Sequence, residues 1–112
     1  EAVFDAKHAL LSVTAELDGK DLVHRWLVAE DGTVLGTSTS ARVGHAALLG
    51  GRVVLGTDDG LVAMKLDSGV LVEAACFSDT QPFVSAQDEV LPQSDGSLVV
   101  VTSKELVQLS LS

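Results

Sequence analysis

The chain has few of the residue types that carry familiar chemistry. Its 112 residues include a single cysteine, Cys76, no tyrosine, and only 4% aromatic residues. One cysteine cannot form an internal disulfide or by itself hold zinc, so cysteine usage leaves the redox compartment open. The apolar run 71–77 around Cys76 predicts a buried thiol that packs as a small hydrophobic group. The low aromatic content leaves few platforms for ligands.

Basic residues are also scarce, with 7 Lys and Arg against 16 Asp and Glu and a formal net charge of −9. Nucleic-acid binding needs a basic stripe that releases counterions, and the basic residues here are well separated along the chain. No apolar run approaches the roughly 20 residues that cross a bilayer. We therefore expect neither direct nucleic-acid binding nor a membrane span.

Short aliphatic runs are what the chain has in abundance. Val, Leu and Ala supply most of the 46% hydrophobic residues, in runs of five to eight that alternate with polar residues. This period of two is typical of strands and predicts an all-β chain. A helix over 5–15 is the one helical alternative, and we favour a strand there. The expected strands are 9–15, 21–28, 33–39, 45–49, 52–57, 61–66, 70–77, 89–93, 97–102 and 105–111.

Turn signals separate these strands at regular intervals. Gly, and to a lesser extent Asp, adopts the positive φ that type I′ and II′ turns and bulges require. Each signal is therefore typical of a hairpin. They lie at 17–19, 30–32, 50–51, 58–60, 67–69 and 94–96.

The strands form a repeat. A Leu-Val pair opens a strand shortly after a polar turn at 22–23, 61–62 and 106–107, with spacings of 39 and 45 residues by subtraction. Periods near 40 that hold four short strands are typical of β-propeller blades. We therefore expect one β-repeat domain over 1–112, with antiparallel four-stranded blades at about 1–41, 42–81 and 82–112.

A second alignment places the first unit out of phase. The segment 7–11 is similar to 44–48, since both contain His-Ala. Accepting that match breaks the better alignment of 31–35 with 68–72. We therefore treat the His-Ala match as accidental.

The middle unit resembles a known family. Gly51-Arg-Val-Val-Leu-Gly-Thr-Asp-Asp-Gly-Leu-Val-Ala-Met-Lys-Leu-Asp-Ser-Gly-Val-Leu71 resembles the PQQ-like (quinoprotein-like) or WD40-type β-propeller repeat. That family includes quinone-dependent dehydrogenases and non-catalytic scaffolds. The tryptophan that commonly follows the last turn is missing, because Val72 and Glu73 stand there, and no adjacent cysteine pair exists. The resemblance therefore implies the propeller fold without a cofactor.

The number of blades is too small for a closed ring. Closed propellers usually have four to eight blades, and this chain holds about two and a half to three. It begins at Glu1 without a signal-like segment, so we expect either part of a longer propeller or identical chains that assemble as a homo-oligomer. Two copies would give about six blades. A small β-sandwich is the alternative fold.

Five residues are candidates for interaction. Arg25 and Trp26 are of the types that dominate interfaces, although a lone Trp is favoured as a packing wedge between blades. His45 opens an expected inner strand, which in a propeller points to the central channel. Asp58 and Asp59 are paired acids that calcium could use, yet an Asp-Gly turn accounts for them better.

No catalytic, cofactor or metal residue is assigned. The three histidines show no paired spacing that predicts a ligand set, and no nucleophile motif is present. The favoured function is a non-catalytic protein-interaction or scaffold module that binds a protein partner or further blades. The alternatives are a carbohydrate-binding lectin of oligomerised blades and a fragment of a propeller enzyme.

Overall fold

A computed structural model describes residues 1–110 and confirms the all-β class. Three of the strands, β5, β6 and β8, have the bounds expected from the sequence, and the expected strand 105–111 extends beyond the described residues. Among residues 1–110, no helix has the length and hydrophobicity that a membrane crossing would need. The elements are β1 (Ala2–Phe4), β2 (His8–Leu17), β3 (Lys20–Ala29), β4 (Val34–Ser40), β5 (His45–Leu49), β6 (Arg52–Thr57), β7 (Gly60–Asp67), β8 (Val70–Phe77), the 3₁₀ helix η1 (Ser78–Phe83), β9 (Glu89–Pro92), β10 (Leu98–Val101) and β11 (Leu106–Leu109).

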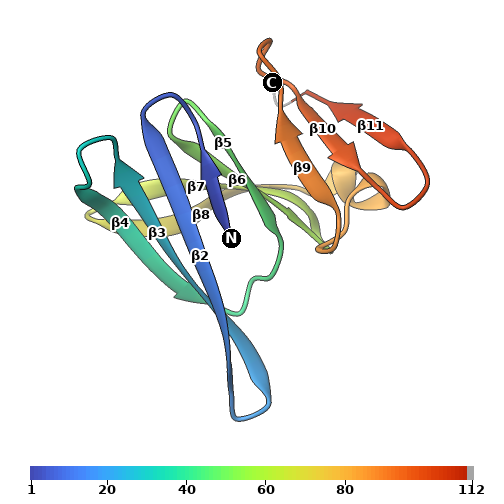
Figure 1. Cartoon of the computed structure of the whole chain (residues 1–112). Coiled ribbons are helices and arrows are strands. Elements are labelled where there is room, and N and C mark those ends of the chain that lie inside the picture. Colours follow the sequence, from blue (N-terminus) through green and yellow to red (C-terminus); the bar gives the residue numbers. More distant parts are fainter. Residues whose placement is uncertain (111–112) are drawn as a thin grey trace.

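The strands form three consecutive antiparallel meanders, β1–β4, β5–β8 and β9–β11 (Figure 1). The first two join through a short parallel contact between β4 and β8, where Thr37 is paired with Val70. The resulting sheet has the order β1-β2-β3-β4-β8-β7-β6-β5, and its edge strands β1 and β5 contact each other. The chain thus has a nearly closed, barrel-like mixed sheet of eight strands, followed by a separate sheet of three.

Most of strands β5, β6 and β7 of the middle meander is buried on both faces. One face lines the barrel interior, where Leu55 and Val62 pack against Leu10 and Leu27 of the first meander. The other face meets the three-stranded sheet in a second aliphatic cluster of buried residues: Ala47, Val54, Leu61, Val84, Val90, Leu98 and Val100. Because β6 contributes alternate side chains to both clusters, its last five residues are all buried. The two aliphatic clusters therefore meet on this meander.

Glycines close the turns where the sequence predicts them. Gly60, which follows Asp58 and Asp59, has φ +99°, and a Cβ there would lie 2.7 Å from the Phe77 carbonyl oxygen. Any side chain at this position would collide with the backbone. The β6–β7 hairpin therefore requires glycine at position 60 for both reasons.

The prediction that Cys76 is a core residue is wrong, because the structure places it on the exposed surface near the end of β8. Strand β8 is hydrogen-bonded to β7 along its length but is paired with β4 only at Val70. The end of β8 near Cys76 therefore has no neighbouring strand on one side. The apolar run around it gave no sign of this, since sheet edges are set by tertiary pairing.

Candidate functional site

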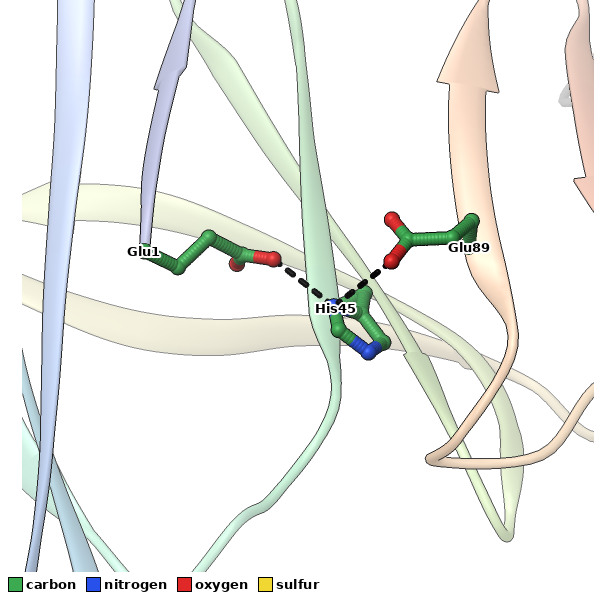
Figure 2. A group of neighbouring side chains, drawn as sticks. All are labelled: Glu1, His45 and Glu89. Carbon is green, nitrogen blue, oxygen red and sulfur yellow. Dashed lines mark hydrogen bonds and ion pairs between the residues drawn. The ribbon is translucent and has the colours of Figure 1, made fainter.

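Three titratable side chains from the three meanders converge at one point. Figure 2 shows Glu1, His45 and Glu89 pointing toward one another. The Nδ1 atom of His45 lies 2.7 Å from Oε2 of Glu1 and 3.7 Å from Oε1 of Glu89. One donor atom from each residue lies within 4.8 Å of the others. An imidazole nitrogen and two carboxylates therefore face a common centre.

The three residues hold equivalent places in the fold. Glu1 directly precedes β1, His45 is the first residue of β5, and Glu89 is the first residue of β9. Subtraction of their positions gives 44 residues between neighbours in both cases. Each is thus at the start of the first strand of its meander. Packing of the middle meander between the other two brings these strand starts together.

The cluster is held in place and remains accessible. The Ala46 amide donates a hydrogen bond of 3.3 Å to Oε1 of Glu1, which orients the carboxylate toward His45. The side chains of His45 and Glu89 are 35% and 60% exposed. A hollow of about 210 Å³ adjoins the cluster, with walls formed by Glu1, Ser12, Thr14, Val23, Val43, Gly44, His45 and Ala86. A small solute can therefore reach the converging donor atoms.

A second ionic group lies near this end of the barrel. Arg42 donates two hydrogen bonds to the carboxylate of Glu73, at 2.9 and 3.0 Å, and a third to Asp59. The hydrogen bonds to Glu73 and Asp59 raise the pKa of Arg42, and the hydrogen bonds that Arg42 donates to Glu73 lower the pKa of Glu73. Arg42 and Glu73 also line an open cleft of about 570 Å³.

Arg25, a candidate for interaction, lies inside the barrel. It is 1% exposed, and its Nη2 donates a hydrogen bond of 2.9 Å to the Arg42 carbonyl oxygen. Its Nε and Nη1 atoms have no hydrogen-bond partner among residues 1–110. Burial lowers the pKa of Arg25, against the opposing attraction of Glu1 and Glu73. The charge of Arg25 therefore acts on Glu1 and Glu73 from inside the barrel and is not presented on the protein surface.

The side chain of Trp26 lies on the face of β3 opposite to that of Arg25. It is half-buried, and its ring lies 4.3 Å from the ring of His24 between centroids. It belongs to neither aliphatic cluster of the described residues. Of the three histidines, His24 lies beside Trp26 and His8 beside Asp5, which leaves His45 alone in the converging cluster.

Asp58 and Asp59 form the β6–β7 turn and make protein contacts. Oδ1 of Asp58 accepts a hydrogen bond of 2.9 Å from the Ala86 amide, and Asp59 accepts the bond from Arg42. The turn therefore ties the loop before β9 and the loop after β4 to the middle meander. The structure does not bring these two acids to His45; it brings Glu1 and Glu89 instead.

Reasoning from the sequence missed the partners of His45. The equal 44-residue spacing could have pointed to Glu1 and Glu89, but the Leu-Val pairs gave unequal spacings of 39 and 45. No sequence pattern pointed to the ion pair between Arg42 and Glu73, because it joins a loop to a strand that is distant in the sequence. No protein-family model, curated protein or solved structure matches this chain.

Proposed function

We propose that the chain is a non-catalytic protein-interaction module whose propeller-type meanders pack face to face with those of a second copy. The proposal rests on one observation, which is that the faces of the three meanders differ in how far they are buried. In the middle meander most of β5, β6 and β7 is buried on both faces, whereas the first and third meanders each have one uncovered face with exposed apolar residues. Uncovered apolar sheet faces are typical of interaction surfaces.

The outer face of the first meander is apolar over several strands. Strand alternation places Trp26 and Val28 on the same side as a set of exposed side chains. These are Phe4, Leu11, Val13, Leu17 and Val34. We call this set, with Trp26 and Val28, the first face. The aromatic ring at its centre is of the kind that anchors interfaces.

The outer face of the three-stranded sheet carries four apolar residues beside the polar Glu89 and Gln108. Leu91 and Leu106 are exposed, and Val99 and Val101 are half-buried on the same side. We call these four residues the last face. A contact between the first face of one copy and the last face of the next is heterologous, so it closes only as a ring. Two copies supply six meanders, which is within the usual range for propellers.

Sedimentation velocity of the full chain tests the assembly. We expect a dimer, and we expect Val13→Glu and Leu106→Glu each to give a folded monomer, because a charge would be buried in both contacts of the ring. Phe83→Glu, at a residue of similar exposure on η1, is the matched control and should remain dimeric. An equimolar mixture of the two monomeric variants should recover a dimer, since it retains one intact contact.

Two results contradict the proposal. A wild-type chain that is monomeric at all concentrations removes the second copy as occupant of these faces. A Leu106→Glu variant that stays dimeric while Val13→Glu becomes monomeric shows a two-fold contact between first faces, and the heterologous ring is then wrong.

A further inference from the structure

We propose that Glu1, His45 and Glu89 bind one divalent transition-metal ion of the Zn²⁺ class at the point where the three meanders meet. This inference does not depend on the assembly proposed above, because all three side chains belong to one chain. The donor set combines one imidazole nitrogen with two carboxylates, and it is built from three separate meanders rather than from one acidic loop.

The donor atoms have the spacing that such an ion needs. Zn²⁺ binds nitrogen and oxygen at about 2.0–2.2 Å, which places two tetrahedral ligands roughly 3.4 Å apart. The distances from Nδ1 of His45 to the two carboxylate oxygens, 2.7 and 3.7 Å, lie on either side of that value. Glu89 is 60% exposed, so its side chain can rotate to complete the geometry without disturbing the core.

The donor types favour a transition metal over calcium or magnesium. Imidazole is a common ligand of Zn²⁺, Co²⁺ and Ni²⁺, whereas Ca²⁺ and Mg²⁺ prefer sites made entirely of oxygen. Three protein donors leave one position of a tetrahedral ion for water. The adjoining hollow of about 210 Å³ has room for that water, with the hydroxyls of Ser12 and Thr14 in its walls.

The electrostatics of the cluster call for a positive species between its members. A protonated Nδ1 can donate a good hydrogen bond to only one of the two carboxylates. An unprotonated Nδ1 presents a lone pair, which repels both carboxylates. A metal ion satisfies the nitrogen and both carboxylates together.

The backbone supports the metal-bound geometry. The Ala46 amide hydrogen-bonds the oxygen of Glu1 that does not face His45, an arrangement typical of the outer shell that orients metal ligands. Because each ligand stands at the start of the first strand of its own meander, the ion would join both edges of the eight-stranded sheet to the three-stranded sheet. Metal binding should therefore stabilise the whole fold.

Titration of the tag-free full chain with Zn²⁺ and Co²⁺ tests the site. We expect one Zn²⁺ per chain by calorimetry, visible d–d absorption typical of low-coordinate Co²⁺, and a rise in melting temperature of about 10 °C at a hundredfold excess over Kd. Ca²⁺ should give none of these. His45→Ala should weaken Zn²⁺ binding by more than about 100-fold, since it removes a direct ligand.

Matched controls separate the site from adventitious binding. His24→Ala removes another half-buried histidine and should bind Zn²⁺ as the wild type does. Glu89→Gln changes an exposed residue and gives a folded protein for the same titration if His45→Ala fails to fold. The proposal is overturned if the wild type binds no Zn²⁺, if Glu89→Gln or His45→Ala retains full affinity, or if His24→Ala loses it.

Discussion

At the scale of single residues, Arg42 is the most connected side chain near the barrel end. Its guanidinium makes a bidentate contact with Glu73 and a further contact with Asp59, so it joins the loop after β4 to β8 and to the β6–β7 turn. Such planar two-bond pairing is specific to arginine. Glu73 is more than one-third exposed, so solvent screens part of this interaction.

The lowered pKa of Glu73 makes its contribution to stability depend on pH. Its folded-state pKa lies below the ordinary value of 4.5, chiefly because Arg42 hydrogen-bonds its carboxylate. The ionised carboxylate therefore favours the folded state above about pH 4.5, and this contribution is lost as pH falls through the lowered pKa. We expect Glu73→Gln to be less stable than the wild type at pH 7 and to approach it toward pH 3.

Urea unfolding from pH 7 to pH 3 measures that difference. Glu16→Gln, at an exposed end of β2, is the control and should follow the wild type throughout. A gap between wild type and Glu73→Gln that stays constant down to pH 3 would show that the ion pair does not set the pH dependence.

At the scale of elements, the 3₁₀ helix η1 is tied to the sheet by one hydroxyl. Oγ1 of Thr80 accepts a hydrogen bond of 2.8 Å from the Leu61 amide and donates one of 2.5 Å to the Phe77 carbonyl. Thr80 and Leu61 are both buried, so the Leu61 amide has no water as a substitute. The hydroxyl thus anchors η1 beneath the β6–β7 hairpin.

Thr80→Val keeps the shape of the side chain and removes this link. We expect it to lower the free energy of unfolding by about 1–3 kcal/mol, because it leaves the buried Leu61 amide without a partner. Thr14→Val, on an exposed part of β2, should change it by less than about 0.5 kcal/mol. Equal stability of the two variants in urea unfolding would exclude the anchoring role.

The strands themselves could be predicted from the sequence because their determinants are local. Alternating aliphatic residues and Asp-Gly turns fix where β5, β6 and β8 begin and end, and positive φ values at Gly60 and Gly69 match the turn chemistry. The parallel contact between β4 and β8 depends on one residue pair 33 positions apart. No local pattern encodes such a contact, so the barrel-like joining of the first two meanders could not be predicted.

The site was only partly predictable for the same reason. His45 was a candidate because it opens an expected inner strand, and the structure places it at the centre of the cluster. Its partners stand at the same place in the other two meanders, which becomes evident only once the starts of β1 and β9 are known. For Cys76 the prediction failed. The apolar run around it predicted burial, but this end of β8 has no second strand paired with it, and the thiol is exposed.

At the scale of the whole molecule, the overlap of two cores on one meander predicts how stability is distributed. Strands β6 and β7 contribute to both aliphatic clusters, whereas β1 and β11 lie at sheet edges and contribute to one. Amides in doubly covered strands open only when the whole fold opens, and edge strands open locally. Native-state hydrogen exchange should therefore be slowest in β6 and β7.

Amide exchange measured by NMR gives a quantitative check of this order. We expect Val54 and Val62 to exchange at least tenfold more slowly than Val3 and Val107, because both central residues are fully buried in the middle meander. A tenfold ratio corresponds to about 1.4 kcal/mol of additional opening free energy. Slower exchange in β2 and β3 than in β6 and β7 would place the most stable unit in the first meander, and the two-core account of stability would then be wrong.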